Sequence, residues 1–439
     1  MFPCHAIRVN NLDLAIKFFL QLAVILLFCR IVGMVAAKFG QPQVVAEMIA
    51  GVVLGPSLFG LLSQMAVDRG WTEVNWQQWL FPWDNSQTMR DTQSYLFPAS
   101  QLGLALYMFI VGMEFRMDII RSKLKSSIAV SAAGMAAPFG LGALLAWWAH
   151  GRPELNLFPV GIPLSSAMIF LGACMCITAF PMLARIIHFK GLNGTTMGTV
   201  AIGAGAIDDA TAWILLAVVL AKLEGDWSKA RDNILGAVYF VIVAFMLVKP
   251  LLLKLEARLT KDGSLTEAGF VLGLAAMCLG AWWTDRIHLH AVFGAFVMGA
   301  VMPRAVMARD LIARIQPLAV ALLLPLFFTS SGLNTQIGLL NSGALWMVCA
   351  AVLVAAVLGK GAACWLAARA SGIPNREALG IGTLMNARGL MELIIINIGL
   401  QKGVITGGLF AVLVIMAVIT TLMASPIFDW LVAKRQPQA

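Results

Sequence analysis

The sequence predicts an all-α protein that spans a membrane many times. Three observations support this prediction: 60% of the 439 residues are hydrophobic, only 12% are charged, and the mean hydropathy is +0.85. Soluble domains contain about a quarter charged residues, so the shortage of charge is the most informative of the three. Apolar segments occupy most of the chain. We therefore expect one transmembrane domain, residues 1–439, without a cytosolic regulatory domain.

A transmembrane helix needs about 20 predominantly apolar residues, and the chain contains about 13 segments that approach this length. The second and the ninth are short and rich in glycine. The predicted spans are 14–37, 43–62, 96–115, 128–149, 161–187, 195–222, 233–253, 266–284, 288–303, 315–333, 343–368, 378–400 and 404–432.

The loops between these spans predict the orientation of the chain. When the spans alternate, most of the 31 Lys and Arg residues fall on one side, as the positive-inside rule requires. This pattern places the N-terminus outside and the C-terminus in the cytoplasm. The net charge of +9 then reflects topology in the lipid bilayer, and we expect no nucleic-acid partner.

The number of spans predicts an internal repeat. Residues 1–222 and 266–439 each supply six spans, and residues 223–265 supply a linker helix between them. One helix between two groups of six places the repeats in opposite orientations, which is the arrangement of inverted-repeat transporters.

Two spans contain predicted breaks at corresponding positions of the repeats. The fifth is interrupted at 178–181, which includes Thr178 and Pro181, and the twelfth at 386–389, which begins with Asn386. Proline removes a backbone donor, and irregular backbone at membrane depth is tolerated only within protein or beside a water-filled cavity. One break alone would suit a simple proline kink. The matched pair favours a binding site.

Asp208 and Asp209 lie about halfway along the sixth span, where a charged group is costly unless it is paired or hydrated. Adjacent helical residues point about 100° apart, so one carboxylate can face a partner while the other faces a cavity. The small residues at 203–206 would let a helix or a hydrated funnel approach. A single Asp could satisfy a backbone donor at a helix break, but two adjacent acids favour a functional site.

Lys360, Arg388 and Glu392 also lie deep within predicted spans. Lys360 could extend to the interface, but several apolar residues follow it, which favours a buried pairing with a carboxylate. Arg388 and Glu392 are four residues apart and could form an ordinary helix ion pair. Alternatively, Arg388 holds carbonyl groups at the break. The sequence leaves open whether these two residues take part in the chemistry or only support the site.

Thr178 places a hydroxyl group beside the carbonyl groups freed at the first break. Oxygen atoms from carboxylates, hydroxyls, carbonyls and water are the ligands of hard cations, so Asp209 and Thr178 are candidate ligands for an alkali cation. The five histidines lie near predicted span ends, and no cluster resembles a transition-metal site. We expect no cofactor and no catalytic group.

Seven segments together resemble the monovalent cation:proton antiporter superfamily, especially the branch of bacterial sodium or potassium/proton antiporters and plant cation/proton exchangers. Each segment alone is a weak signal, whereas their order and spacing are specific. The segments are Gln41-Pro42 through Gly55-Pro56-Ser57, Phe109 to Glu114, Thr178 to Arg185, Ile207-Asp208-Asp209, His290 to Pro303, Leu324 to Phe328 and Met385 to Leu390.

This resemblance implies a homodimer in the bacterial inner membrane, with a scaffold domain and a mobile core domain that holds two crossed broken helices. It implies that Asp209 is the main carboxylate for cation and proton, that Asp208 pairs with Lys360, and that Thr178 is an ancillary ligand. The residues expected to support the site are Pro181, Asn386, Arg388 and Glu392.

The expected activity is secondary transport rather than enzymatic catalysis: exchange of K⁺ or Na⁺ for protons by alternating access. Proton and cation would compete for Asp209, and the double-acid motif is associated with electrogenic exchange. The alternatives are a cation-coupled symporter of an organic anion on a related fold and a cation channel. The oxygen ligands are too generic to separate sodium from potassium, although the plant-exchanger-like segments favour potassium slightly.

Overall fold

The computed structural model describes residues 11–39, 41, 43–81, 87–114, 123–192, 194–224, 227–287, 290–333, 340 and 342–432. The prediction that the N-terminus lies outside and the C-terminus in the cytoplasm concerns residues 1–10 and 433–439, which lie outside the described residues. Within it the chain is almost entirely helical. The strands described are β1 (Thr260–Lys261) and β2 (Ser264–Leu265), which pair as an antiparallel hairpin.

The helices of the first half are α1 (Asn11–Lys38), α2 (Gln43–Leu54), α3 (Leu61–Asp68), α4 (Trp76–Leu80), α5 (Gln87–Glu114), α7 (Leu124–His150), α8 (Leu164–Cys176), α9 (Phe180–Phe189) and α10 (Thr196–Glu224). Those of the second half are α11 (Trp227–Val243), α12 (Lys249–Leu259), α13 (Glu267–Arg286), α14 (Ala291–Val301), α15 (Met307–Leu318), α16 (Leu324–Leu333), α17 (Gly343–Ala370), α18 (Asn375–Leu384), α19 (Leu390–Gln401) and α20 (Gly407–Leu431). The short helical turns are η1 (Pro56–Gly60), η2 (Pro153–Leu155), η3 (Ala244–Val248) and η4 (Ala319–Leu323).

Ten helical stretches among the described residues are long and apolar enough to cross a membrane. Three shorter apolar helices, Leu164–Cys176, Ala291–Val301 and Met391–Gln401, fall within the fifth, ninth and twelfth predicted spans. The prediction of an all-α, multi-pass membrane protein is therefore confirmed. The count of about 13 spans is reached only if the short helices are included, so the exact number stays a prediction.

The tenth predicted span begins earlier than expected, at Met307 rather than 315. The charged residues in its first turns suggested a loop, but they bind the β1–β2 hairpin. Asp310 accepts a hydrogen bond from the Leu265 amide at 2.7 Å, and Arg314 donates to the Leu265 carbonyl at 2.7 Å. These contacts give the charged turns partners in the hairpin.

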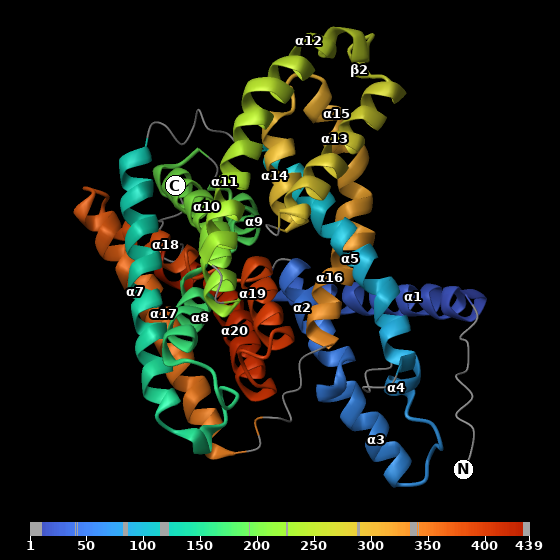
Figure 1. Cartoon of the computed structure of the whole chain (residues 1–439), viewed down its shortest axis with the longest axis vertical. Helices are drawn as coiled ribbons and strands as arrows, with labels where there is room; N and C mark the ends of the chain where they lie inside the picture. The colour runs from blue at the N-terminus through green and yellow to red at the C-terminus, as the bar shows by residue number, and fades with distance from the viewer. Residues whose placement is uncertain are drawn as a thin grey trace.

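The helices form two bundles, each built from both halves of the chain (Figure 1). In the core bundle, α7 packs against α8, α10 and α17, and α18 packs against α17 and α20. In the scaffold bundle, α5 packs against α14 and α16, and α2 packs against α1 and α16. We use "core bundle" for α7–α10 with α17–α20, and "scaffold bundle" for α1–α5 with α13–α16. Both bundles therefore combine helices from the two predicted repeats, while the inverted repeat and its boundaries stay a prediction.

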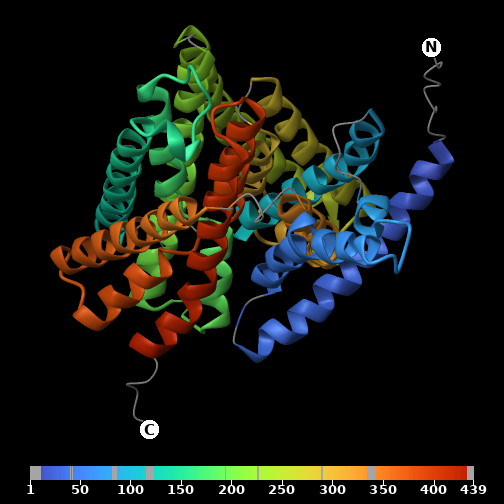
Figure 2. The ribbon, with the colours of Figure 1, turned by 90° about the horizontal axis from the view of Figure 1, so that it is seen from below.

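Small residues allow close helix crossings in the scaffold bundle. A Cβ atom added at Gly112 of α5 would overlap the Phe296 carbonyl oxygen of α14, and one added at Gly299 would overlap the Phe109 carbonyl oxygen. Backbones that approach this closely gain dispersion contacts that lipid tails cannot supply. Figure 2 shows α1 (dark blue) along the outer edge of this bundle, where its large apolar side chains, such as Phe19 and Leu27, are exposed.

The two bundles also contact each other directly. The Gln41 side chain, in the α1–α2 connection, donates a hydrogen bond to the Leu422 carbonyl of α20 at 2.9 Å. Trp213 of α10 packs against His290 and Phe293 at the start of α14, with ring centroids 5.9 Å apart in each pair. The polypeptide connection from α10 to the scaffold bundle runs through α11, η3 and α12.

Candidate functional site

The first break in the core bundle separates α8 from α9. The helix ends at Cys176, and residues 177–179 are extended before α9 begins at Phe180. Pro181 is the second residue of α9, where its missing N–H interrupts no helical hydrogen bond; its side chain lies outside the described atoms. The observed break at 177–179 therefore overlaps the predicted interruption at 178–181 but begins and ends earlier.

The second break separates α18 from α19 and crosses the first. The extended segment 387–389 follows α18, and the Ala179 amide donates to the Ala387 carbonyl at 3.1 Å. Thr421 of α20 satisfies the backbone of Arg388: its Oγ1 accepts from the Arg388 amide at 3.0 Å and donates to the Arg388 carbonyl at 2.7 Å. The prediction of crossed broken helices is confirmed.

Asp208 lies beside the crossover and has partners from three directions. Its Oδ1 accepts from Ser131 Oγ of α7 at 2.6 Å, and its Oδ2 accepts from the Thr178 hydroxyl. Lys360 Nζ of α17 lies 3.4 Å from Oδ2. Asp208 and Lys360 are fully buried, and buried charges are tolerated when they are paired and hydrogen-bonded. The structure thus brings Asp208, Thr178 and Lys360 together.

Lys360 also binds the backbone at the first break. Its ammonium donates to the Cys176 carbonyl and, at 3.1 Å, to the Gly134 carbonyl of α7. Cys176 is the last residue of α8, where helix carbonyls lack partners within the helix. One cation therefore neutralises Asp208 and satisfies a carbonyl group that the break leaves free.

Asp209 faces different surroundings from Asp208, as the helical geometry predicts. Its exposed fraction is 3%, and its Oδ1 has no hydrogen-bond partner among the described residues. The Thr178 hydroxyl binds Asp208 rather than Asp209. Because an ionised buried carboxylate needs a positive partner, Asp209 is suited to bind a proton or a cation.

Arg388 in the second break and Glu392 in the first turn of α19 are both fully buried. Arg388 Nη2 donates to the Met175 carbonyl at 2.7 Å, and Nη1 donates to the Cys174 carbonyl at 3.3 Å. Nη1 also lies 3.5 Å from Glu392 Oε1. The two interpretations left open by the sequence therefore coexist: Arg388 holds carbonyls at the end of α8 and keeps an ion pair within its own segment.

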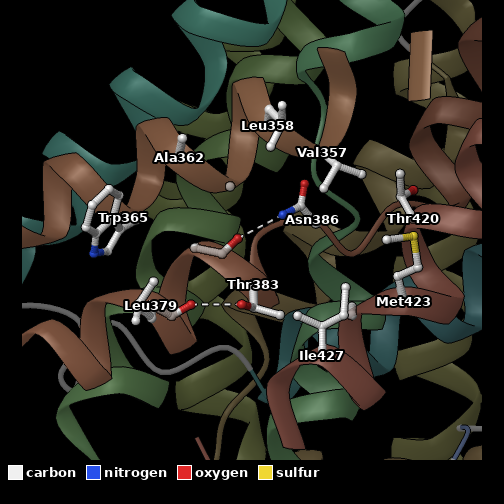
Figure 3. Close-up of a pocket in the computed structure, with 13 residues that line it drawn as sticks. Val357, Leu358, Ala362, Trp365, Leu379, Thr383, Asn386, Thr420, Met423 and Ile427 are labelled. Atoms are coloured by element: carbon white, nitrogen blue, oxygen red, sulfur yellow. Dashed lines mark hydrogen bonds between the residues drawn. The ribbon is translucent and has the colours of Figure 1, made fainter. Parts of the chain in front are cut away.

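Asn386 lines a separate cavity of about 180 Å³ between α17, α18 and α20 (Figure 3). Its amide nitrogen donates to the Gly382 carbonyl at 3.0 Å, and its Oδ1 has no hydrogen-bond partner among the described residues. The rest of the wall is largely apolar, with Leu358 and Trp365 on α17. Asp208, Asp209 and Lys360 are not among the residues that line this cavity.

Ser131 is a hydrogen-bond partner of Asp208 that the sequence did not single out. A serine inside a helix usually bonds a carbonyl of its own preceding turn, so its presence in an apolar span is a weak signal. Only the packing of α7 against α10 directs its hydroxyl to Asp208.

Comparison with known proteins gives consistent matches along the chain. Residues 23–434 match the sequence profile of the family "Sodium/hydrogen exchanger, transmembrane". The Na(+)/H(+) antiporter NhaS4 of Synechocystis is 36% identical over 412 residues, which cover 93% of this chain and 95% of that protein. Cation/H(+) antiporter 15 of Arabidopsis thaliana is 31% identical over 421 residues, 95% of this chain. The match covers 48% of the plant protein, so the chain spans about half its length.

The fold is similar to that of a solved structure, the sodium proton antiporter MjNhaP1 from Methanocaldococcus jannaschii. The TM-score is 0.66, and the match covers 94% of this chain and 96% of the other. The sequence identity is 13%, so this likeness concerns the fold alone.

Proposed function

The chain belongs to the sodium/hydrogen exchanger family, and on that premise we propose that it exchanges a monovalent cation, Na⁺ or K⁺, for protons across the membrane. Its relatives carry names of Na(+)/H(+) and cation/H(+) antiporters, which support this activity. The observation that carries the proposal is the contrast between the two acids: Asp208 is fully bonded, whereas Asp209 is buried with an oxygen that has no described partner.

This contrast assigns different roles to the two acids. A proton and an alkali cation each neutralise Asp209, and both cannot occupy the same carboxylate oxygens. Loading one therefore expels the other, which is the chemical basis of exchange. Asp208 stays with Lys360, Ser131 and Thr178 and holds the crossover together beside the cargo site. Pro181 and Asn386 support the two breaks.

The site reaches both sides of the membrane when the core bundle moves relative to the scaffold bundle, which is alternating access. We propose that more than one proton is exchanged for each cation, as the double-acid motif suggests, which makes the transport electrogenic. We propose a homodimer in the bacterial inner membrane, with the N-terminus outside and the C-terminus in the cytoplasm.

Proteoliposomes that contain a pH-sensitive dye test the activity. We expect Na⁺ or K⁺, but not choline, to dequench the dye with the wild type, and we expect Asp209→Asn to abolish the response, because an amide binds neither proton nor cation in this way. Asp232→Asn is the matched control, since Asp232 is an exposed partner of Arg231.

Two results would contradict the proposal. One is a wild type that responds to no alkali cation at any pH, in which case uptake of a labelled organic anion becomes the next assay. The other is cation-dependent dequenching that survives Asp209→Asn unchanged.

A further inference from the structure

We propose that Glu392 is a second proton-binding carboxylate. Its protonation controls whether Arg388 stays hydrogen-bonded to the carbonyls at the end of α8. This inference rests on the proposed exchange function. It adds a proton that tunes cation affinity without occupying the Asp209 site.

Glu392 lacks the contacts that normally stabilise a buried carboxylate. It is fully buried, and neither carboxylate oxygen has a hydrogen-bond partner among the described residues. Its ion pair with Arg388 has an N–O distance of 3.5 Å, longer than the roughly 2.7–2.9 Å of a charge-assisted hydrogen bond. An unsatisfied buried group of this kind requires a physical explanation, and a bound proton supplies one, because it removes the charge.

Arg388 is placed between two competing sets of acceptors. Its guanidinium lies closer to the Met175 and Cys174 carbonyls than to Glu392, and its Nε has no hydrogen-bond partner among the described residues. When Glu392 is neutral, the guanidinium stays on the carbonyls. When Glu392 releases its proton to solution, the new negative charge attracts the guanidinium away from α8.

The carbonyls that Arg388 holds belong to the last turn of α8, directly before the segment that carries Thr178. Thr178 in turn bonds Asp208, the neighbour of Asp209. Loss of the hydrogen bonds from Arg388 to these carbonyls is thus transmitted through the backbone and through Thr178 to the proposed cargo site. Glu392 acts through Arg388 and is therefore a positioning residue.

Two opposing influences keep both protonation states accessible. Burial without donors disfavours the ionised form. The positive end of α19 favours it, because Glu392 lies in the first turn of that helix. The other titratable groups that interact electrostatically with Glu392 are Arg388, Lys360 of α17 and the Cys174 thiol of α8. Both cations favour the ionised form.

The test is the pH dependence of the apparent KM for the cation, measured with purified protein in proteoliposomes. The slope of log KM against pH counts the protons displaced by each cation. We expect Glu392→Gln to lower this slope by about one, with cation-specific exchange still detectable, and Glu392→Asp to restore it. Glu377→Gln, the same change in the first turn of α18, should keep the wild-type slope.

An unchanged slope in folded Glu392→Gln would overturn the inference. If that variant does not fold, infrared difference spectra of the wild type and Glu392→Asp provide the test. Cation addition should remove a protonated-carboxyl band, and the frequency of this band should differ between the two proteins. Identical bands in the two proteins would overturn the inference. The proposed exchange is judged separately. It fails if Asp209→Asn still exchanges, whereas the Glu392 inference fails alone if Asp209→Asn is inactive and Glu392→Gln keeps the slope.

Discussion

At the scale of single residues, the central feature is the set of donors around Asp208. Ser131, Thr178 and Lys360 come from α7, the first break and α17, respectively, so one carboxylate joins three separate segments of the core bundle. Each donor offsets part of the cost of burying the charge. Removal of one donor should weaken the bundle as well as the site.

Ser131→Ala tests this role. The hydroxyl donates to a carboxylate at 2.6 Å, and hydrogen bonds to charged groups contribute about 1.5–3 kcal/mol, so we expect the free energy of unfolding to fall by about that amount. Ser127, one turn earlier on α7, donates to the neutral Val200 carbonyl at 3.3 Å, and Ser127→Ala should cost about 0.5–1.5 kcal/mol. Thermal unfolding in detergent compares the two variants. Equal losses would show that the charge on Asp208 is not what Ser131 stabilises.

At the scale of elements, the crossover depends on helices that do not themselves break. Thr421 of the continuous helix α20 both accepts from the Arg388 amide and donates to its carbonyl. Unpaired backbone groups in a membrane cost several kcal/mol, so the extended segment 387–389 is stable because α20 supplies the partner.

Thr421→Val should therefore be strongly destabilising. It leaves two buried backbone groups unpaired, which costs about 2 kcal/mol or more. Thr420→Val is the matched control, because the described acceptors of the Thr420 hydroxyl are carbonyls of its own helix, Met416 at 2.8 Å and Ala417 at 3.2 Å. We expect that control to lose less than about 1 kcal/mol by thermal unfolding in detergent. A loss for Thr421→Val no larger than for Thr420→Val would contradict this account.

The same elements show how far the sequence predicts the structure. Pro181 and Gly389 indicated approximately where the helices break, because proline and glycine act locally. The divergence of Asp208 and Asp209 followed from helical geometry alone. The acceptors of Arg388 and the role of Ser131 could not be predicted, since backbone carbonyls carry no sequence signal and a serine's partner depends on which helix packs against it. The α8 terminus at Cys176, ahead of the proline, likewise depends on Lys360 from the other half of the chain.

At the scale of the whole molecule, the two bundles share a cluster of buried apolar residues, and directed side-chain contacts also join them. The hydrogen bond from Gln41 to Leu422 and the packing of Trp213 against His290 and Phe293 cross the boundary between them. Asp209 lies one helical turn before Trp213 on α10, so the proposed cargo site is carried by the same helix as this contact. If the core bundle moves as proposed, both contacts must change during each cycle.

A reversible crosslink between Gln41→Cys and Leu422→Cys should therefore block exchange. We would replace the exposed Cys278 by serine and use a bifunctional methanethiosulfonate. Exchange in proteoliposomes should be lost on crosslinking and regained on reduction. The matched control joins Lys190→Cys and Asp429→Cys, which form an ion pair at 2.6 Å within the core bundle and should tolerate the crosslink. Full exchange with Gln41 and Leu422 completely crosslinked would exclude relative motion at this contact.

The hydrogen bond between Ala179 and Ala387 has a consequence for biosynthesis. Its donor is translated with the first half of the chain and its acceptor with the second, and synthesis proceeds at about 5–20 residues per second. For roughly ten seconds or more, the nascent α8–α9 segment has unpaired polar backbone in or near a lipid environment, and the Asp208 carboxylate of α10 lacks its Lys360 partner. The first broken helix therefore cannot reach its native state during its own translation. It must be sheltered, by the insertion machinery or by water, until α17–α20 emerge and complete the core bundle.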